Sequence, residues 1–537
     1  MYSDKKNILQ LASLLEAHGV GDIVLCPGSR NAPIVHTLSQ VSAFHCYQET
    51  DERNAGFMAL GMSVATGKAT AVCCTSGSAL VNLHPAVVEA FYQRVPLIVI
   101  SADRPACWIG QQDGQTLPQP GVFGPMVKFM ASLPEVRSGE DEWYCNRLIN
   151  EALLTATLGH PGPVHINVPI SEPLYRFTVD KLPDVRVIRR AGQPTDLLKV
   201  MKTTSKRMII SGQCSKKEQY DFSLITNLPN HFVLLGEHLA NLSSKSSFIS
   251  NFDPILENAS PEELESLRPE LLVTYGGHIV SGRLKKFLRR YPPQYHWHIS
   301  AEGDVTDTFR CLTCVCENRP TPFFNKLDLD LMYTGNYTFK TTSYIQLWNE
   351  RSATAPLPAP DYSPRSVTGD VVTRLPGNSN LHLGNSSVVR YAQQYPLLPD
   401  RALEVHCNRG VNGIEGSLPA AVGTALVSFP FPTFLLIGDL SFFYGMNALC
   451  RDVPPNLRVL LLNDFGGRIF RTLKGMPEGE SRRFIMGQHD VTAKAWAVER
   501  GFRYIAVHNR GEWEKACRLF VSSRRLTKPM LVEAFFD

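Results

Sequence analysis

Two acidic residues, Asp439 and Asp464, each follow a short apolar run that ends in turn-forming residues. The runs, 434–437 and 457–462, are typical of buried strands in a parallel sheet. A right-handed strand–helix–strand unit would bring both strand ends to one edge of the sheet, where α/β proteins bind ligands. Two carboxylates there, with a carbonyl group from the glycine turn that follows, suit Mg²⁺ that keeps diphosphate oxygens as its other ligands. Taken singly, each residue is better explained as an ordinary turn aspartate, and it is the pair at two strand ends that favours a metal site.

Arginine side chains are the second chemical signal, because a guanidinium group binds carboxylate or phosphate through two parallel hydrogen bonds. Four of them come just after predicted strands or early in predicted helices: Arg30, Arg104, Arg390 and Arg409. Polar residues in the same motifs are Ser29, Gln115 and Ser386. One such arginine would more often be a surface ion-pair partner, but the set indicates a site for small molecules with several negative charges.

Glu52 is a third candidate, at the start of a helix predicted over 53–66. The helix dipole favours a carboxylate at this position, so stabilisation of the helix N-terminus is enough to explain Glu52 as an isolated residue. Thr50 or Asp51 can supply the N-cap. The helix itself is rich in alanine and glycine, which allow another backbone to approach closely.

Alternating strand and helix patterns must position these residues. The first part of the chain has predicted strands at 23–26, 44–47, 70–74, 96–101 and 163–168, and predicted helices at 7–18, 33–38, 53–66 and 79–93. The alternation continues more weakly and then returns after a proline-rich linker predicted at 351–365, with a helix at 442–450 between the two strands described first. We therefore predict an α/β fold of three doubly wound domains with mainly parallel sheets, at 1–184, 185–350 and 351–537.

Length and composition exclude several classes of protein. A chain of 537 residues is too long for one core, and its 44% hydrophobic and 19% charged residues fit a soluble globular protein. The formal net charge of +4, without a Lys/Arg-rich run, does not favour a nucleic-acid partner. Neither a membrane-spanning run nor the apolar core of a signal peptide is visible, so we expect a cytoplasmic protein.

The cysteines fit free thiols in a reducing compartment, since there are 13 of them at irregular positions. One cluster has a partial resemblance to a zinc site: His296, His298, Cys311, Cys314 and Cys316. No second C-x-x-C or H-x₃-H pair follows it, so the match to a structural zinc site is poor.

Ordered motifs across the chain resemble those of one enzyme family. They read CPGSRNAPI, DERNAGFMALGMSVATG, CTSGSALVNLHPAVVEA, ISADRP, GNSSVVR and NRGVNGIEG, followed by the GD and ND pairs at 438–439 and 463–464. Together they are similar to the 2-succinyl-5-enolpyruvyl-6-hydroxy-3-cyclohexene-1-carboxylate synthases (the MenD family), which depend on thiamine diphosphate. The matches span roughly 8–170 and 375–486, and the middle of the chain matches poorly.

The resemblance implies a role for each candidate residue. Glu52 resembles the glutamate that hydrogen-bonds the cofactor aminopyrimidine and so promotes loss of the thiazolium proton. Asp439, Asp464 and the carbonyl of Gly466 resemble the ligands of Mg²⁺ or Mn²⁺, although the family often has Asn in place of Asp464. Other cofactor-binding positions match Ser386, Arg409, Ile414, Gly438, Ile469 and Phe470. Substrate-binding positions match Ser29, Arg30, Arg104, Gln115, Arg390 and Arg409, of which Ser29, Arg30 and Gln115 are also expected to act in catalysis.

The reaction implied is a decarboxylation followed by a carbon–carbon bond formation in menaquinone biosynthesis. 2-Oxoglutarate loses CO₂, with the cofactor as electron sink, and the resulting carbanion adds in a 1,4-addition to isochorismate. Because both substrates are dicarboxylates, this transferase reaction accounts for several arginines. The alternative within the superfamily is another thiamine-diphosphate-dependent 2-oxoacid decarboxylase or carboligase.

The same resemblance implies an oligomer. In this superfamily the cofactor bridges two chains, so Glu52 would come from one subunit and Asp439 from another, in a homodimer or homotetramer. One departure from the family concerns the segment 302–304, Glu-Gly-Asp, where a basic residue often follows the glycine.

Overall fold

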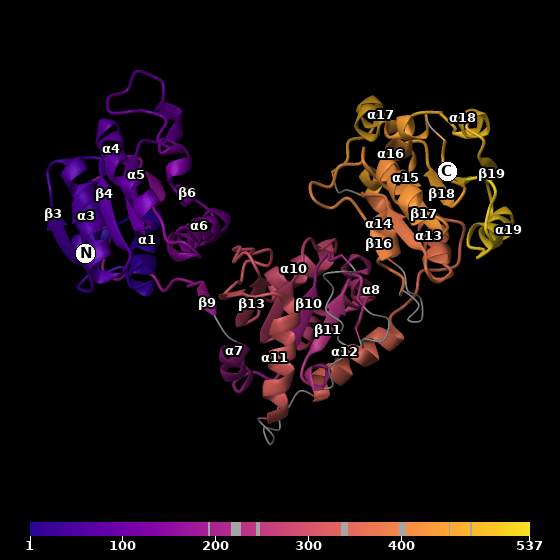
Figure 1. The fold of residues 1–537 in the computed structure, drawn as a ribbon, viewed down its shortest axis with the longest axis horizontal. Helices are drawn as coiled ribbons and strands as arrows, with labels where there is room; N and C mark the ends of the chain where they lie inside the picture. The colour runs from indigo at the N-terminus through magenta and orange to yellow at the C-terminus, as the bar shows by residue number, and fades with distance from the viewer. Residues whose placement is uncertain are drawn as a thin grey trace. The chain divides into compact units, whose positions relative to one another are not determined.

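The computed structural model describes residues 1–191, 194–215, 227–242, 248–333, 342–396, 404–450, 452–472 and 475–536. The chain divides into two compact units, the first comprising 1–191 and 302–317 and the second 192–301 and 318–537. We call them unit 1 and unit 2 and describe each by itself (Figure 1).

Unit 1 contains a six-stranded sheet in the order β3-β2-β4-β5-β7-β6, in which all neighbouring strands are parallel. Its strands are β2 (Asp22–Leu25), β3 (His45–Gln48), β4 (Thr70–Cys74), β5 (Leu97–Asp103), β6 (Phe129–Ser132) and β7 (Val164–Pro169). A short antiparallel pair, β1 (Tyr2–Ser3) with β8 (Phe177–Val179), and a parallel pair, β9 (Arg189–Ala191) with β14 (Cys314–Glu317), complete the strands of this unit.

Helices cover both faces of this sheet because its strands are apolar on both sides. Ile23 of β2 packs in one cluster with α1 (Lys6–Ala17), α2 (Ala32–Ser39) and α6 (Gly139–Thr157). The next residue along the strand, Val24, packs in another cluster with α3 (Glu52–Thr66), α4 (Ser78–Asn82) and α5 (His84–Gln93). Successive strand residues point to opposite faces, so the unit is doubly wound as predicted.

Unit 2 contains a second six-stranded parallel sheet, in the order β16-β15-β17-β18-β20-β19. Its strands are β15 (Asn380–Leu383), β16 (Glu404–His406), β17 (Thr433–Gly438), β18 (Leu457–Asn463), β19 (Arg503–Val507) and β20 (Met530–Phe535). One face packs against α13 (Pro364–Val372), α14 (Ser387–Ala392) and α19 (Arg510–Phe520), and the other against α15 (Ser417–Ser428), α16 (Asp439–Tyr444) and α18 (Lys494–Glu499). A short helix, α17 (Glu480–Met486), follows β18 along the chain.

Four further parallel strands of unit 2 form a sheet in the order β11-β10-β12-β13. They are β10 (Arg207–Ser211), β11 (Val233–Gly236), β12 (Leu271–Tyr275) and β13 (Tyr295–Ser300). The helices of this part are α7 (Pro194–Met201), α8 (Phe252–Asn258), α9 (Pro261–Leu267), α10 (Gly282–Arg290), α11 (Pro320–Tyr333) and α12 (Thr342–Thr354). The amide of Asn241 exchanges two hydrogen bonds with the backbone of Val405, of 3.0 and 2.7 Å, which joins this part to the second sheet.

Three local predictions were wrong in detail. The helix predicted at 79–93 is two helices that break at Leu83, where Pro85 lacks the N–H that a continuous helix needs. The helix predicted at 442–450 begins earlier, at Asp439, and ends at Tyr444 before a 3₁₀ turn, η6 (Met446–Leu449). The predicted linker at 351–365 is helical up to Thr354, so the boundary at 350/351 falls inside α12, and the division into three domains stays a prediction.

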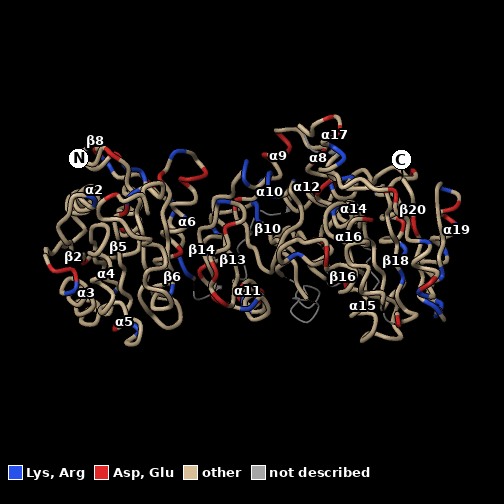
Figure 2. The backbone as a smooth tube through the Cα atoms, turned by 90° about the horizontal axis from the view of Figure 1, so that it is seen from above, with Lys and Arg blue, Asp and Glu red and all other residues tan. Residues whose placement is uncertain are grey.

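Charge and the histidine–cysteine cluster complete this description. Basic and acidic positions are interspersed along the backbone of both units, in keeping with the small net charge (Figure 2). His296 and His298 each lie 2.9 Å from the hydroxyl oxygen of Thr274, and the described ranges hold no group of three His, Cys, Asp or Glu residues placed to bind a metal ion. None of the described helices combines the length and apolar composition that crossing a bilayer requires.

Candidate active site

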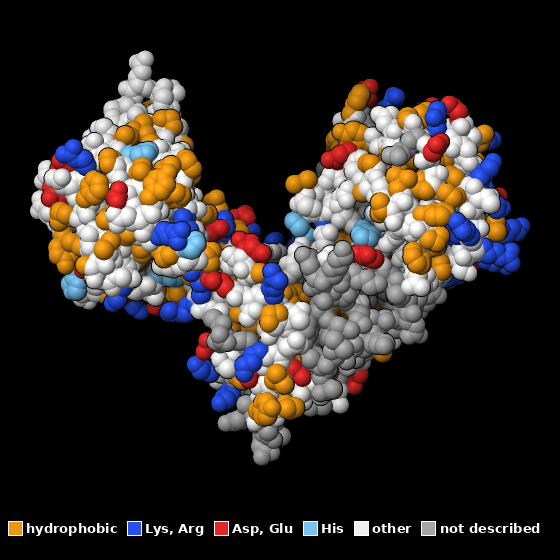
Figure 3. Space-filling view, viewed as in Figure 1, with side chains coloured by type: hydrophobic (Ala, Val, Ile, Leu, Met, Phe, Trp, Pro, Cys, Tyr) orange, Lys and Arg blue, Asp and Glu red, His pale blue; other side chains and the backbone are white. Residues whose placement is uncertain are grey.

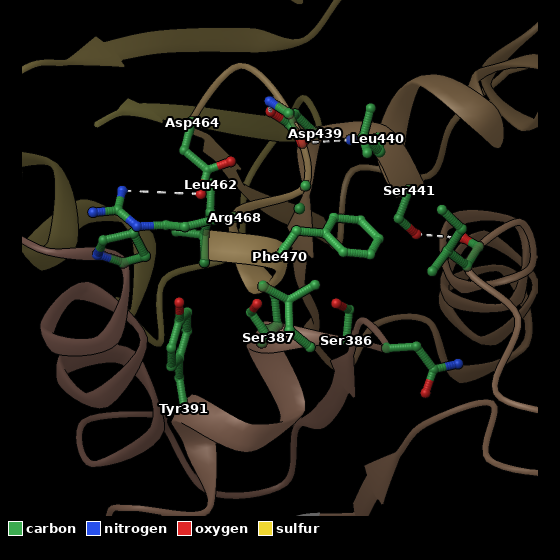
Figure 4. Close-up of a pocket in the computed structure, with 18 residues that line it drawn as sticks. Ser386, Ser387, Tyr391, Asp439, Leu440, Ser441, Leu462, Asp464, Arg468 and Phe470 are labelled. Atoms are coloured by element: carbon green, nitrogen blue, oxygen red, sulfur yellow. Dashed lines mark hydrogen bonds and ion pairs between the residues drawn. The ribbon is translucent and has the colours of Figure 1, made fainter. Parts of the chain in front are cut away.

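A pocket lies in unit 2 at the carboxyl ends of β15, β17 and β18. Many of the residues predicted to bind a cofactor line it: Ser386, Ile414, Gly438, Asp439, Asp464, Gly466, Ile469 and Phe470. They come from four separate segments of the chain, which the parallel sheet brings together at one edge, as Figure 4 shows for the labelled residues.

Asp439 and Asp464 stand at the ends of neighbouring strands. β17 and β18 pair in parallel with Gly438 opposite Leu462, so the residues that follow them emerge at the same level. The backbone N–H of Gly466 donates a 2.8 Å hydrogen bond to Oδ2 of Asp439. The turn after one strand therefore holds the carboxylate that follows the other.

Asp439 is buried, and this burial raises the pKa of its carboxyl group. Hydrogen bonds from the backbone N–H groups of Gly466 and Leu440 oppose that shift, and Nε2 of His489 lies 3.2 Å from Oδ2. Nδ1 of His489 accepts a 3.1 Å hydrogen bond from the N–H of Val491, so a neutral imidazole carries its proton on Nε2, facing Asp439.

The turn after β18 has an unusual backbone that a buried polar network supports. Phe465 has a φ of 57° and Gly466 a φ of 149°, and a Cβ added to Gly466 would meet the carbonyl oxygen of Met486 at 3.1 Å. Behind the turn, Asn463 accepts a 3.2 Å hydrogen bond from the N–H of Phe465 and donates one of 2.8 Å to the fully buried Glu533. This arrangement fixes the direction in which Asp464 and the carbonyl of Gly466 point.

The donor set fits a hard divalent cation and a diphosphate group. Mg²⁺ prefers oxygen ligands, and the pocket offers the carboxylates of Asp439 and Asp464 and the carbonyl of Gly466. That carbonyl accepts a hydrogen bond from Arg468 N–H at 3.0 Å and keeps a second lone pair. A Cβ at Gly438 would meet no atom within 4 Å, so the edge is open for a ligand.

Apolar and hydroxyl groups shape the rest of the pocket. The hydroxyl group of Ser441 donates a hydrogen bond to the carbonyl of Ile414, which holds the Ile414 segment in the pocket wall. Phe470 projects into the pocket above Ser386 and Ser387 in Figure 4. Ser386 itself has a φ of 73°, a strained conformation at the start of α14 of the kind that clusters at ligand sites.

Positive charge gathers beside this pocket. Nη1 of the buried Arg409 donates a 3.2 Å hydrogen bond to Asn385, a lining residue, and Arg390 donates one to the carbonyl of Ser386. Burial and the charge of Arg409 lower the pKa of Arg390. Lys285 of α10 belongs to the same group of cations. Burial lowers the pKa of its ammonium group and Glu237 opposes that shift, but the charges of Arg409 and Arg390 lower the pKa further, which shows that they lie near Lys285.

Glu52 lies in unit 1 at the start of α3. Its neighbour Asp51 caps the helix by accepting hydrogen bonds from the N–H groups of Arg53 and Asn54, of 2.9 and 3.3 Å. Glu52 is therefore not needed as the cap, and its Oε2 accepts a 3.4 Å hydrogen bond from Asn82. Its half-buried carboxylate faces the end of β2, where burial and then Glu52 raise the pKa of Cys26 to about 12.

Ser29, Arg30 and Arg104 lie in the turns after β2 and β5, and both of these arginines already have partners. Nη1 of Arg30 donates a 3.0 Å hydrogen bond to the carbonyl of Ile170, and Nη2 is 3.1 Å from Glu172. Arg104 binds the carbonyl of Gly114 at 2.9 Å and Asp113 at 3.1 Å. Ser29 and Gln115 are both exposed.

Gln119 is a buried residue that no pattern in the sequence indicates. Its amide nitrogen donates hydrogen bonds of 2.7 Å to Asn167 and 3.0 Å to the carbonyl of Ala102, and its Oε1 accepts one of 2.8 Å from the N–H of Gly77. It thereby ties the loop that carries Gln115 to β5 and β7. Only these contacts identify Gln119 as a structural residue, because a single glutamine in a loop belongs to no recognisable sequence motif.

Both units expose large apolar side chains (Figure 3). In unit 1 they include four on the helices that begin with or follow Glu52 in the chain: Phe57 and Val64 of α3, Val81 of α4 and Tyr92 of α5. In unit 2 they include Leu426 and Val427 of α15, which precedes β17, and Tyr444 of α16, which follows it. Patches of this kind on a folded protein mark contact surfaces.

The predicted site residues thus divide between the units. Unit 1 holds Ser29, Arg30, Glu52, Arg104 and Gln115, and unit 2 holds the others. The sequence did not single out several polar residues that line the pocket or belong to the cations beside it. They are Lys285, Asn385, Ser387, Tyr391, Ser441 and Arg468. Asn385 and Ser387 adjoin a predicted residue in sequence, whereas Lys285 is far from all of them.

Comparison with known proteins gives consistent results over the whole chain. Residues 9–121 match the family described as "Thiamine pyrophosphate enzyme, N-terminal TPP binding domain". A protein of Phocaeicola vulgatus is 53% identical over 100% of this chain and 96% of its own length, and one of Bacteroides thetaiotaomicron is 51% identical over the same shares. A protein of Flavobacterium johnsoniae is 37% identical over 99% of this chain and 95% of its own length. All three are named 2-succinyl-5-enolpyruvyl-6-hydroxy-3-cyclohexene-1-carboxylate synthase.

Proposed function

Because the chain belongs to the 2-succinyl-5-enolpyruvyl-6-hydroxy-3-cyclohexene-1-carboxylate synthase family, we propose that it carries out this reaction in menaquinone biosynthesis. 2-Oxoglutarate is decarboxylated, and its remaining four-carbon unit is joined to isochorismate. Thiamine diphosphate, when bound, supplies the electron sink for the decarboxylation. The observation that carries the proposal is the convergence of Asp439, Asp464 and Gly466 at one sheet edge.

Asp439, Asp464 and the carbonyl of Gly466 hold Mg²⁺ or Mn²⁺ and, through it, the diphosphate group. The proposal is supported by the oxygen-only donor set and by the turn that fixes it. The N–H groups of Gly466 and Leu440 orient the Asp439 carboxylate. Ser441 holds Ile414 in place, and Ile414, Ile469 and Phe470 form the apolar wall for the organic part of the cofactor.

Glu52 is the acid–base residue that hydrogen-bonds the cofactor pyrimidine. A half-buried carboxylate that is free of the capping role is suited to this, because capping is done by Asp51. Glu52 is contributed by a second copy of the chain, in a homodimer or homotetramer. The exposed apolar side chains of α3, α4 and α5 beside it support such an interface.

Arg409, Arg390 and Lys285 bind substrate carboxylates. Neighbouring cations raise one another's energy, and an anionic substrate relieves that repulsion. Two dicarboxylates need several such groups, which favours this reaction over the decarboxylation of a monocarboxylic 2-oxoacid. Ser29, Arg30, Arg104 and Gln115 are proposed to complete the substrate site from the strand ends of unit 1.

An omission assay tests the proposal. The purified protein is incubated with thiamine diphosphate, Mg²⁺, 2-oxoglutarate and isochorismate, and the loss of isochorismate is followed with each component left out in turn. We expect consumption only in the complete mixture. Release of CO₂ from 2-oxoglutarate without loss of isochorismate would instead identify a different thiamine-diphosphate-dependent decarboxylase or carboligase.

A further inference from the structure

Arg468 lines the same pocket as Asp439 and Asp464, although nothing in the sequence pattern singles it out. It begins the 3₁₀ turn η7 (Arg468–Thr472), one turn beyond Asp464. Nη1 of its guanidinium lies 3.9 Å from Oδ2 of Asp464, and Figure 4 shows the two side chains extending toward each other. The side chain of Asp464 is 11% exposed and that of Arg468 28%, so both charges are partly shielded from water.

The backbone keeps Arg468 in this position. The N–H of Arg468 donates a 3.0 Å hydrogen bond to the carbonyl of Gly466, and the N–H of Gly467 donates one of 2.7 Å to the carbonyl of Met486. Nη1 of Arg468 is buried yet has no hydrogen-bond partner among the residues that the structure describes. Arg468 therefore interacts with Asp464 through the attraction of opposite charges, without a hydrogen bond from Nη1.

Charge balance explains why a cation is useful there. Two ionised aspartates already neutralise a divalent cation, and a diphosphate group brings further negative charge to the same point. Repulsion between the second carboxylate and the diphosphate acts across a partly buried pocket, where charges interact more strongly than in bulk water. A guanidinium group next to Asp464 offsets that repulsion.

We propose that Arg468 is a positioning residue that neutralises Asp464, so that two carboxylates and a diphosphate group can share one divalent cation. The inference rests on the proposed function, because it concerns how the cofactor diphosphate and its metal are held. In this proposal Asp464 and Arg468 act together on cofactor binding. An exposed ion pair between residues one helical turn apart would contribute little to stability, so stability alone does not explain the pair.

A double-mutant cycle on cofactor binding tests the pair. The variants are Asp464→Asn, Arg468→Gln and the double variant, with Arg468→Lys as the charge-conserving change and Arg518→Gln on α19 as a control outside the pocket. The readout is the Kd for thiamine diphosphate at saturating Mg²⁺, measured by calorimetry on the full-length protein. Thermal unfolding without ligands shows that each variant is folded.

We expect Arg468→Gln to weaken binding about tenfold when Asp464 is present and less than about twofold when position 464 is Asn. Arg468→Lys and Arg518→Gln should stay within about twofold of the wild type. Equal weakening in both backgrounds would overturn the proposal and show that Arg468 binds the cofactor directly. No weakening in either background would also overturn it, and a wild-type protein that binds no thiamine diphosphate would overturn the proposed function itself.

Discussion

The backbone N–H of Gly466 donates a 2.8 Å hydrogen bond to Oδ2 of Asp439, although the two residues follow different strands of the sheet. This bond makes the two strand-end turns one structural unit, since moving either turn would take the Gly466 donor away from Oδ2 of the buried Asp439 carboxylate. An unpaired buried carboxylate is costly, so the bond preserves the geometry of the proposed cation site before any ligand binds.

Asp439→Ala should abolish metal-dependent binding of thiamine diphosphate while the fold survives. The substitution removes one of two carboxylate ligands and leaves the N–H groups of Gly466 and Leu440 without an acceptor. We expect Kd in the presence of Mg²⁺ to rise at least about 100-fold, and the free energy of unfolding to fall by about 1–3 kcal/mol. Calorimetry and denaturant unfolding measure the two effects, with Asp452→Ala on the loop before β18 as the control. Retained binding in Asp439→Ala would exclude Asp439 as a ligand.

Glu52→Gln should abolish turnover and leave the protein folded. The amide retains the shape of the side chain but cannot exchange a proton with the cofactor, a loss that costs about 10²–10⁴-fold in rate. Capping by Asp51 is unaffected, so thermal stability should match that of the wild type. The loss of isochorismate in the complete assay is the measurement, and Glu89→Gln on α5 is the matched control. Near-wild-type conversion by Glu52→Gln would contradict the assignment of Glu52 as the acid–base residue.

Arg409→Lys should separate charge from geometry in substrate binding. Lysine keeps the positive charge but cannot bind a carboxylate in a bidentate manner while it also contacts Asn385. We expect KM for 2-oxoglutarate to rise about tenfold, with Lys285→Met giving a smaller rise of about threefold, because an ammonium group does not bind a carboxylate in a bidentate manner. Steady-state kinetics with 2-oxoglutarate varied provide the values. Lys286→Met, on the exposed side of α10, should leave KM unchanged.

Glu237 should make stability depend on pH. It is buried at the end of β11, where burial raises the pKa of its carboxyl group to about 7 and hydrogen bonds from the N–H groups of Val280 and Ser281, of 2.7 and 2.6 Å, oppose the shift. Since the folded state holds this proton more tightly than the unfolded state, its contribution to stability is fully present at low pH and is lost as the pH rises through about 7.

Glu237→Gln removes this dependence. Relative to the variant, the wild type should lose about 2 kcal/mol of unfolding free energy between about pH 5 and pH 8. Denaturant unfolding at several pH values measures the difference, and Glu257→Gln on the surface of α8 serves as the control. Parallel pH profiles for wild type and Glu237→Gln would show that this carboxyl group titrates normally.

The sequence by itself determined the features that depend on local pattern. Apolar runs closed by turns predicted β17 and β18, and with them the positions of Asp439 and Asp464 at one sheet edge, because strand periodicity and chain handedness are local properties. The doubly wound α/β architecture was confirmed for the same reason. The cap of α3 was also foreseen, although only the structure selected Asp51 over Thr50.

Tertiary structure alone decided which polar groups are already paired and which are left for a ligand. Arg30 follows a strand as predicted, yet Ile170 and Glu172 bind its guanidinium group, whereas Arg409, Arg390 and Lys285 lie close enough to repel one another. These relations join residues that are far apart in the chain. Their distances follow from the packing of whole helices and sheets, which no local pattern of residue types encodes.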